Sequence, residues 1–89
     1  MESAVVSVLD SLIKSEEVKG VLIADEHGLC LGAKGIVNPN SAGFISAIAT
    51  HAKSLHDDPN IQAPIIKIET EKLTILIQNN GNYTLAVFK

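Results

Sequence analysis

The sequence predicts a single α/β domain of the α+β type, with the order helix-strand-strand-helix-strand-strand-strand. An unbroken apolar run over residues 20–24 indicates a strand that is covered on both faces. A helix-start signal at Asn38-Pro39 and three β-rich runs in the C-terminal third supply the other elements. At 89 residues with 46% hydrophobic side chains, the chain can build one core, which is marginal without a partner.

A first helix is expected over about residues 4–14, with Ser3 as its N-cap. Apolar side chains recur there at helical spacing, and we expect the face that they form to pack on the sheet: Val5, Val8, Leu9, Leu12 and Ile13.

The next two strands are expected to form a hairpin at the heart of the sheet. The strand over residues 20–24 is followed by Asp25-Glu26-His27-Gly28, which combines a turn-forming carboxylate with a glycine that can take a positive φ. The chain then reverses into residues 29–32. This motif indicates architecture and association, and it carries no sign of catalysis.

The second helix is predicted to begin at Asn38, with Pro39 at its first position, and to run to about Leu55. Three strands follow over residues 65–70, 73–78 and 83–88. Glu71-Lys72 separates the first two. Asn79-Asn80-Gly81 separates the last two and is a strong hairpin signal.

The second helix has a wider apolar arc than packing on one sheet requires. At 100° per residue the arc spans roughly 160°, against about 100° for a helix that only covers its own sheet. The arc contains Ala42, Phe44, Ile45, Ile48, Ala49, Ala52 and Leu55. A deeply wrapped helix in an ordinary two-layer core explains this width, as does a second partner. The alanines favour the partner, because small side chains let another helix come close.

Charge and composition exclude several classes of function. All seven basic residues are scattered lysines, and without arginine the chain can offer neither bidentate recognition of phosphate or guanine nor an arginine finger. Without tryptophan or an aromatic cluster it also lacks a stacking platform, so we expect no nucleic-acid partner. No segment reaches the roughly 20 apolar residues of a membrane span, and Glu2 and Asp10 argue against a signal peptide. We expect a cytoplasmic protein without direct membrane insertion.

The residues that could carry chemistry do not form a set. Cys30 has Leu29 and Leu31 beside it and is expected to be a core or interface residue rather than a nucleophile. His51 and His56 lie about 140° apart on a helix, unlike the pair of a zinc helix, although Asp57 and Asp58 follow them. We therefore expect no catalytic residue, no metal and no cofactor, while an enzyme using Cys30 and a histidine remains the alternative of a different class.

The spacing of glycines, prolines and core aliphatics across nearly the whole chain resembles a known family. That family is the hepatitis B X-interacting proteins, the roadblock-type subunits of the Ragulator complex. The resemblance rests on Gly20-Val21-Leu22, Asp25, Gly28-Leu29, Leu31-Gly32, Gly35, Ala42-Gly43, Asp58-Pro59, Pro64, Ile77-Gln78, Gly81 and Ala86-Val87. It implies a roadblock/profilin-like fold, in which a five-stranded antiparallel sheet has a helix on each side and no third helix.

The resemblance also implies a non-catalytic scaffold on the cytosolic face of the late endosome and lysosome. Its implied partners are a second roadblock-type subunit, a lipid-anchored belt subunit and, through the assembly, Rag GTPases in amino-acid signalling to the mTOR kinase complex. Val5, Val6, Val8 and Phe44 depart from the family pattern, so a homodimeric roadblock adaptor for another small GTPase or a motor remains the alternative. The expected protein interface comprises Phe44, Ile45, Ile48, Ala52, Leu55, Ile65, Ile66, Lys67, Ile68 and Glu69.

Overall fold

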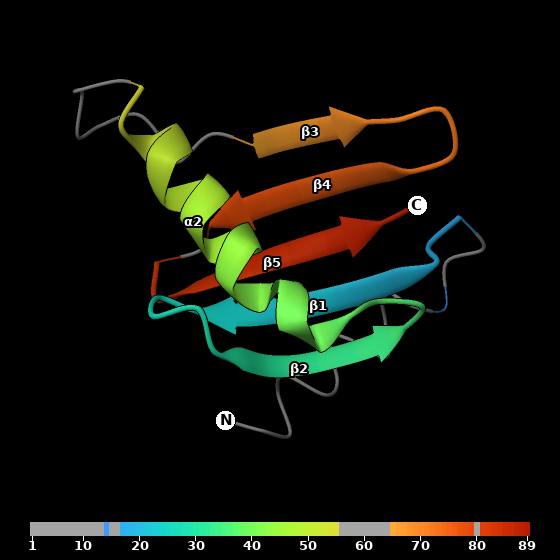
Figure 1. Ribbon diagram of the computed structural model, residues 1–89, viewed down its shortest axis with the longest axis horizontal. Helices are drawn as coiled ribbons and strands as arrows, with labels where there is room; N and C mark the ends of the chain where they lie inside the picture. The colour runs from blue at the N-terminus through green and yellow to red at the C-terminus, as the bar shows by residue number, and fades with distance from the viewer. Residues whose placement is uncertain (1–13, 15–16, 56–64, 80) are drawn as a thin grey trace.

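Five strands form one antiparallel sheet, as the sequence predicts. The computed structural model describes residues 14, 17–55, 65–79 and 81–89. The strands are β1 (Gly20–Asp25), β2 (Cys30–Gly35), β3 (Ile65–Glu69), β4 (Thr74–Asn79) and β5 (Tyr83–Phe88). Their spatial order is β2-β1-β5-β4-β3, so β2 and β3 are the two edges (Figure 1). The helix predicted over residues 4–14 lies outside the described residues, apart from its last position.

Strand β1 is buried on both faces, which confirms the interpretation of its apolar run. Val21, Leu22, Ile23 and Ala24 are each at most 2% exposed. Leu22 and Ala24 belong to the core on one face of the sheet, and Val21 and Ile23 form a second cluster on the other face. Hydrogen-bonded neighbours β2 and β5 flank β1 on either side.

The turn between β1 and β2 is held by the carboxylate that the sequence places there. Asp25 Oδ1 accepts the backbone N–H groups of His27 and Leu29, each at 2.8 Å. Gly28 has φ 87°, a conformation that side-chain-bearing residues rarely adopt. A Cβ at Gly28 would lie 3.1 Å from the Gly43 Cα, so the turn also approaches the helix closely.

A helical segment begins where Asn38 and Pro39 predict, but its first turn is a 3-10 turn, and the α-helix begins only at Ala42. Asn38 caps a short 3-10 turn, η1 (Pro39–Ser41), by accepting the Asn40 N–H at 3.0 Å. Helix α2 (Ala42–Lys53) follows directly. It ends two residues before the predicted Leu55, because the Ser54 N–H already bonds back to the helix as its C-cap.

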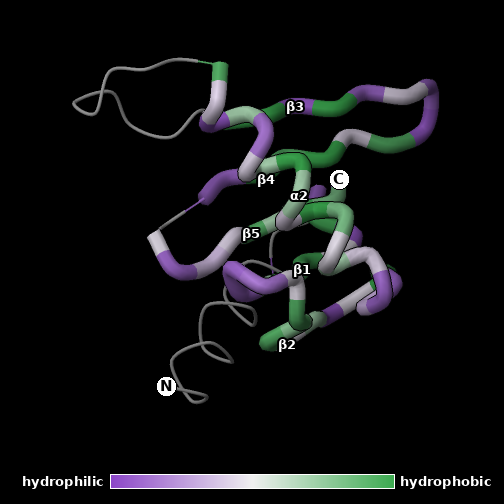
Figure 2. Tube along the Cα trace, turned by 60° about the vertical axis from the view of Figure 1, so that its left-hand side comes forward, coloured by the Kyte–Doolittle hydropathy of each residue, from purple (hydrophilic) through white to green (hydrophobic). Residues whose placement is uncertain are grey.

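Helix α2 lies diagonally across one face of the sheet and packs on β1, β5 and β4 (Figure 1). The core between them is built from Leu22, Ala24, Ala42, Ile45, Ala49, Ile77 and Ala86. Figure 2 shows hydrophobic residues along β3 and β4 and hydrophilic residues at the turns that join the strands. Because α2 crosses the sheet at an angle, it leaves part of β3, β4 and β5 uncovered on the same face (Figure 1).

Candidate protein-interaction surface

The wide apolar arc of α2 divides into a side that faces the sheet and a side that does not. Ile45 is 4% exposed and Ala52 9%, so both are buried within this chain. Phe44 is 76% exposed and Leu55, just past the end of the helix, is 84% exposed. Ile48 is half-buried between them and packs against the core. The exposed side is a stripe of large apolar residues that this chain's own sheet does not cover.

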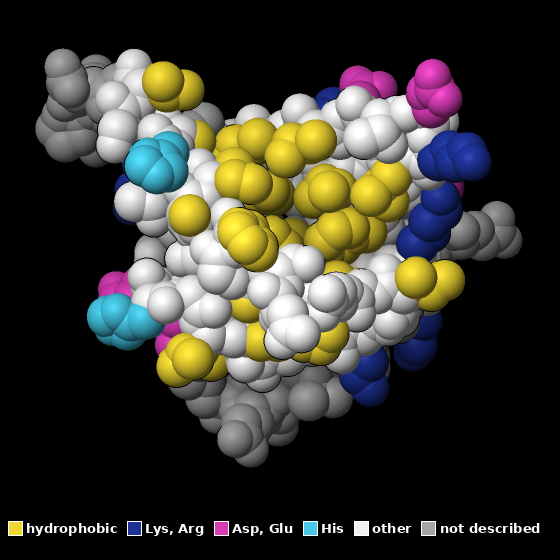
Figure 3. Space-filling view, viewed as in Figure 1, with side chains coloured by type: hydrophobic (Ala, Val, Ile, Leu, Met, Phe, Trp, Pro, Cys, Tyr) yellow, Lys and Arg dark blue, Asp and Glu magenta, His cyan; other side chains and the backbone are white. Residues whose placement is uncertain are grey.

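The uncovered part of the sheet presents a matching apolar row. The register places Ile68 of β3 opposite Ile75 of β4, and Ile75 opposite Phe88 of β5. All three are half-buried and, with Ile66, pack against the edge of the core on the α2 side. Figure 3 shows these hydrophobic side chains gathered beside α2 over β3, β4 and β5.

We call this region the α2–β3 surface. It consists of Phe44 and Ile48 from the helix and Ile66, Ile68, Ile75 and Phe88 from the sheet. Contiguous apolar surface of this kind, next to an open sheet edge, is typical of a protein–protein contact.

Two members of the α2–β3 surface, Ile75 and Phe88, are missing from the predicted set. The alternation of side chains along β4 and β5 could have identified them, because it places residues 75, 77, 86 and 88 on the face of the sheet that α2 packs against. The register that aligns Ile75 and Phe88 with Ile68 needs the turn geometry, which one sequence does not supply.

Among the described strands, β3 forms one of the two open edges of the sheet, and its hydrogen-bonding direction follows from the bonds near the β3–β4 turn. The Thr70 N–H donates to the Leu73 carbonyl at 2.8 Å. Thr74 exchanges both of its backbone bonds with Lys89, at 2.8 and 3.1 Å, so the backbone groups of Thr74 face β5 rather than β3. Glu69, which lies opposite Thr74, is therefore in a non-hydrogen-bonded pair with it.

Hydrogen-bonded and non-hydrogen-bonded pairs alternate along an antiparallel ladder. The backbone N–H and C=O groups of every second residue of β3 therefore point the same way as those of Glu69. The backbone N–H and C=O groups of Ile65, Lys67 and Glu69 point to the open edge. Those of Ile66 and Ile68 point to β4 and bond to Ile77 and Ile75, which lie opposite them. Strand β3 thus presents three residues with backbone groups available to an added strand.

The side chains of these outward-facing residues lie on the face of β3 away from α2. Ile65 is 66% exposed, and Lys67 Nζ and Glu69 Oε1 form an exposed ion pair of 3.2 Å. An exposed pair of this kind contributes only about 0–1 kcal/mol to stability. Its charges instead determine what a neighbouring strand can place opposite them.

The structure brings most of the predicted interface residues to one side of the molecule. Phe44, Ile48, Ile66 and Ile68 meet on the α2–β3 surface, while Ile65, Lys67 and Glu69 line the open edge beside it. Ile45 and Ala52 point into this chain's own core, and Leu55 is exposed beyond the helix end. The apolar side chains that α2 leaves exposed therefore come from its outer stripe rather than from its whole arc.

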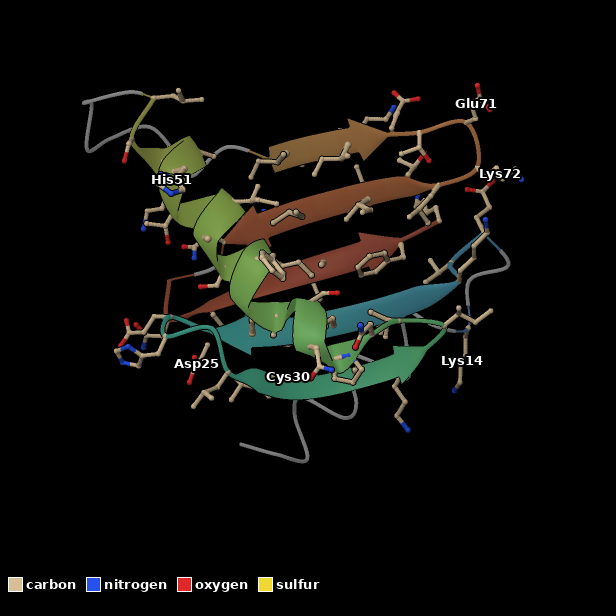
Figure 4. The ribbon with its side chains drawn as sticks, in the orientation of Figure 1. Lys14, Asp25, Cys30, His51, Glu71 and Lys72 are labelled. Carbon is tan, nitrogen blue, oxygen red and sulfur yellow. The ribbon has the colours of Figure 1, made fainter. Side chains whose placement is uncertain are left out.

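The described residues do not gather a chemical site. The sequence predicts Cys30 as a core or interface residue; it is exposed, so the core alternative is wrong and the interface alternative stays a prediction. It lies on the edge strand β2, where a bulge shifts the pairing with β1. Cys30, Asp25 and His51 lie on different elements. Cys30 lies opposite Ala24, next to Asp25 across the β1–β2 turn, whereas His51 lies well apart from both in Figure 4. Within the described residues, no group of three or more His, Cys, Asp or Glu side chains could hold a metal ion. His56, Asp57 and Asp58 lie outside the described residues.

Comparison with known proteins identifies the family. A family model for the Ragulator complex protein LAMTOR5 matches residues 1–89. The chain belongs to the LAMTOR5 family. It is 37% identical to the LAMTOR5 homolog of Nematostella vectensis and 35% identical to LAMTOR5 of Xenopus laevis. In both cases the match covers 100% of this chain and 97% of the relative.

Solved structures confirm the roadblock-type fold of this LAMTOR5-family chain. MglB of Myxococcus xanthus aligns with a TM-score of 0.83 at 19% identity, over 98% of this chain and 70% of that one. A Roadblock/LC7 domain from Streptomyces avermitilis aligns with a TM-score of 0.59 at 18% identity, over 92% and 72%. In the part of the chain that the structure describes, no helix has the length and apolarity to cross a membrane.

Proposed function

We propose that this LAMTOR5-family chain is a non-catalytic scaffold subunit of a Ragulator-type complex, and that it pairs with a second roadblock-type subunit through the α2–β3 surface and the β3 edge. The observation that carries this proposal is the apolar surface itself, with Phe44 76% exposed on α2 and strand β3 at an edge of the same sheet. A marginal core of this size gains stability when such a surface is covered. The relatives are named as Ragulator complex proteins, and this supports a Ragulator-type complex as the assembly.

The finer parts of the proposal rest on what the resemblance to the Ragulator subunits implies. The assembly is held at the cytosolic face of the late endosome and lysosome by a lipid-anchored belt subunit. There it supports the recruitment of Rag GTPases and amino-acid signalling to the mTOR kinase complex. The chain contributes surface rather than chemistry, because it has no arginine to insert into a GTPase site.

The experiment replaces Phe44 with aspartate and compares it with Thr50→Asp. Both positions are exposed, and Thr50 lies about 160° around the helix from Ile48, away from the α2–β3 surface. A charge at Phe44 would be buried without a partner in the complex, at a cost of several kcal/mol. We expect Phe44→Asp to keep native circular dichroism and to lose its partners in affinity purification from native cells.

Thr50→Asp should retain the same partners. Identification of the co-purifying subunits separates the two candidates, since the homodimeric adaptor would bring down copies of itself and its GTPase or motor but no Ragulator subunits. Retention of a full set of Ragulator subunits by Phe44→Asp would show that the α2–β3 surface is not the contact.

A further inference from the structure

Lysines that are scattered along the sequence gather at one end of the folded sheet. The start of β1, the end of β2, the end of β5 and the turn between β3 and β4 meet at this end (Figure 1). Figure 3 shows basic side chains along the same, right-hand side. We call it the lysine end, and its exposed lysines are Lys14, Lys19, Lys34 and Lys72.

The fold holds two of these lysines close together. Lys19 precedes β1, and its Nζ donates a hydrogen bond to the Lys72 carbonyl oxygen at 3.0 Å. The charge of Lys19 therefore lies against the turn that carries the Lys72 side chain. Lys89, which is half-buried, follows β5 at the same end. Like charges on neighbouring positions repel each other, and an anionic partner relieves that repulsion.

Fewer carboxylates than lysines lie at this end. Among the described residues, Glu17 and Glu71 are the exposed carboxylates beside the four lysines. Glu69, at the end of β3, is already paired with Lys67 at 3.2 Å. Asp25 lies at the opposite end of the sheet in Figure 4. Because the whole chain has a net charge of -3, the lysine end is a local excess of positive charge on an acidic protein.

A large apolar side chain lies among these lysines. Ile36 directly follows β2, two residues after Lys34, and is 82% exposed. Its N–H donates to the Lys19 carbonyl at 2.8 Å. A Cβ at Gly20 would lie 2.6 Å from the Ile36 carbonyl oxygen, so the glycine permits this close approach. Backbone contacts therefore hold Ile36 in place at the lysine end, and Figure 3 shows a hydrophobic side chain between the basic ones there.

We propose that the lysine end docks on the surface of an anionic lipid bilayer, with its lysines at the lipid phosphates and Ile36 at the level of the headgroups. Lysines beside an exposed apolar side chain are typical of proteins that lie on a membrane surface. An ammonium group attracts phosphate as a point charge, so the contact needs no bidentate arginine.

The placement of the lysines favours a bilayer over an acidic protein segment. They come from separate elements across one end of the sheet, whereas a bound peptide follows a single strand edge or helix face. Strands β2 and β3 are opposite edges, so a partner on the α2–β3 surface leaves Lys34 and Ile36 accessible. The lipid contact adds to the proposed scaffold and does not depend on pairing through β3.

Vesicle flotation with the full chain measures the contact. Vesicles of phosphatidylcholine alone are compared with vesicles that contain about 40% phosphatidylserine, an anionic lipid. We expect binding to the second kind only, and loss of that binding in about 1 M salt, where the Debye length falls to about 3 Å. Equal binding to both kinds of vesicle contradicts the proposal.

Two double variants make the same change in net charge at different places. Lys34→Gln/Lys72→Gln alters the lysine end, whereas Lys53→Gln/Lys67→Gln alters the end of α2 and strand β3. Each lysine near an anionic surface contributes about fivefold in affinity, so the first variant should bind about five- to twenty-five-fold more weakly. The control should change by less than about twofold, because its lysines lie beyond the contact. Equal losses in the two variants would show that only net charge matters, and the proposal would be wrong.

Ile36→Ser tests the apolar part of the contact. It should weaken vesicle binding by about three- to tenfold and leave the salt dependence unchanged, because it removes apolar surface and no charge. All substituted side chains are exposed, and circular dichroism checks that each variant keeps its fold. Lys72→Gln alone, with an expected loss of about fivefold, serves as the variant if the double substitution disturbs the sheet.

An acidic protein partner would give a different pattern. A labelled oligoglutamate peptide would then bind more tightly than the anionic vesicles, and Ile36→Ser would have no effect on either. That pattern, or the absence of binding to vesicles with phosphatidylserine, overturns the proposal. Neither result bears on association with a second roadblock-type subunit, which affinity purification measures separately.

Discussion

Two neighbouring proline substitutions in β3 should have opposite effects, because their N–H groups face opposite sides of the strand. Proline has no N–H and is tolerated in a sheet only where that group is not part of a ladder. The Lys67 N–H points to the open edge, whereas the Ile68 N–H points to β4 in a hydrogen-bonded pair with Ile75. Lys67→Pro should therefore leave a folded chain that no longer pairs, and Ile68→Pro should damage the sheet.

The expected losses in the free energy of unfolding follow from the interactions that each substitution removes. Ile68→Pro leaves the Ile75 carbonyl without its donor, at about 1–3 kcal/mol, and removes a half-buried side chain worth a further 1–2 kcal/mol or so. That loss of about 2–5 kcal/mol is a large part of the 5–15 kcal/mol that stabilises a typical domain. Lys67→Pro removes an exposed ion pair with Glu69 and costs about 1 kcal/mol or less within the chain.

Urea denaturation followed by circular dichroism measures the free energy of unfolding, and sedimentation velocity with the co-purified partner measures association. Lys67→Ala and Ile68→Ala separate loss of the side chain from loss of the N–H group. The reasoning is refuted if Lys67→Pro unfolds the chain while Ile68→Pro is as stable as Ile68→Ala. The Lys67 N–H would then point to β4 and the Ile68 N–H to the open edge, the reverse of what we infer.

Three further predictions concern the turn, the cysteine and GTP hydrolysis. Gly28→Ala should lower the free energy of unfolding by about 1–3 kcal/mol, because φ is 87° and the added Cβ would lie 3.1 Å from the Gly43 Cα. Gly43→Ala, whose Cβ would meet nothing within 4 Å, should instead be neutral or stabilise the helix by up to about 1 kcal/mol in the same denaturation assay. Cys30→Ser should leave partner binding unchanged in affinity purification, whereas loss of a measurable activity would favour the enzyme. The purified chain should neither hydrolyse GTP nor accelerate a Rag GTPase by the roughly 10³–10⁵ of an arginine finger, and a comparable acceleration in a single-turnover assay would contradict the scaffold.

Local signals in the sequence were sufficient for most of the fold. Asp25 and Gly28 mark their turn because a carboxylate acceptor and a positive φ are both needed there. Asn38 and Pro39 mark the helix start for equally local reasons, because the Asn38 side chain caps the first turn and the ring of Pro39 fixes its φ at a helical value. The apolar run of β1 predicted a buried strand because no residue in it suits a solvent-facing position.

The α2–β3 surface was only partly predictable, because it depends on relations between elements. Helical spacing identified Phe44 and Ile48 but could not show that Ile45 turns into this chain's own core. The row that joins Ile68 to Ile75 and Phe88 is set by strand register. The exposure of Cys30 depends on the position of β2 at the edge of the sheet, which no feature of its neighbours in sequence reveals.

Amide hydrogen exchange along β3 tests the proposed pairing most directly. It is measured by NMR on the dilute free chain and again after assembly with the co-purified partner. In the free chain, the amides of Ile66 and Ile68 should exchange slowly and those of Lys67 and Glu69 quickly. Assembly should slow Lys67 and Glu69 by about tenfold or more, because their N–H groups enter a new ladder. If Lys67 and Glu69 exchange as fast in the complex as in the free chain, pairing through the β3 edge is contradicted.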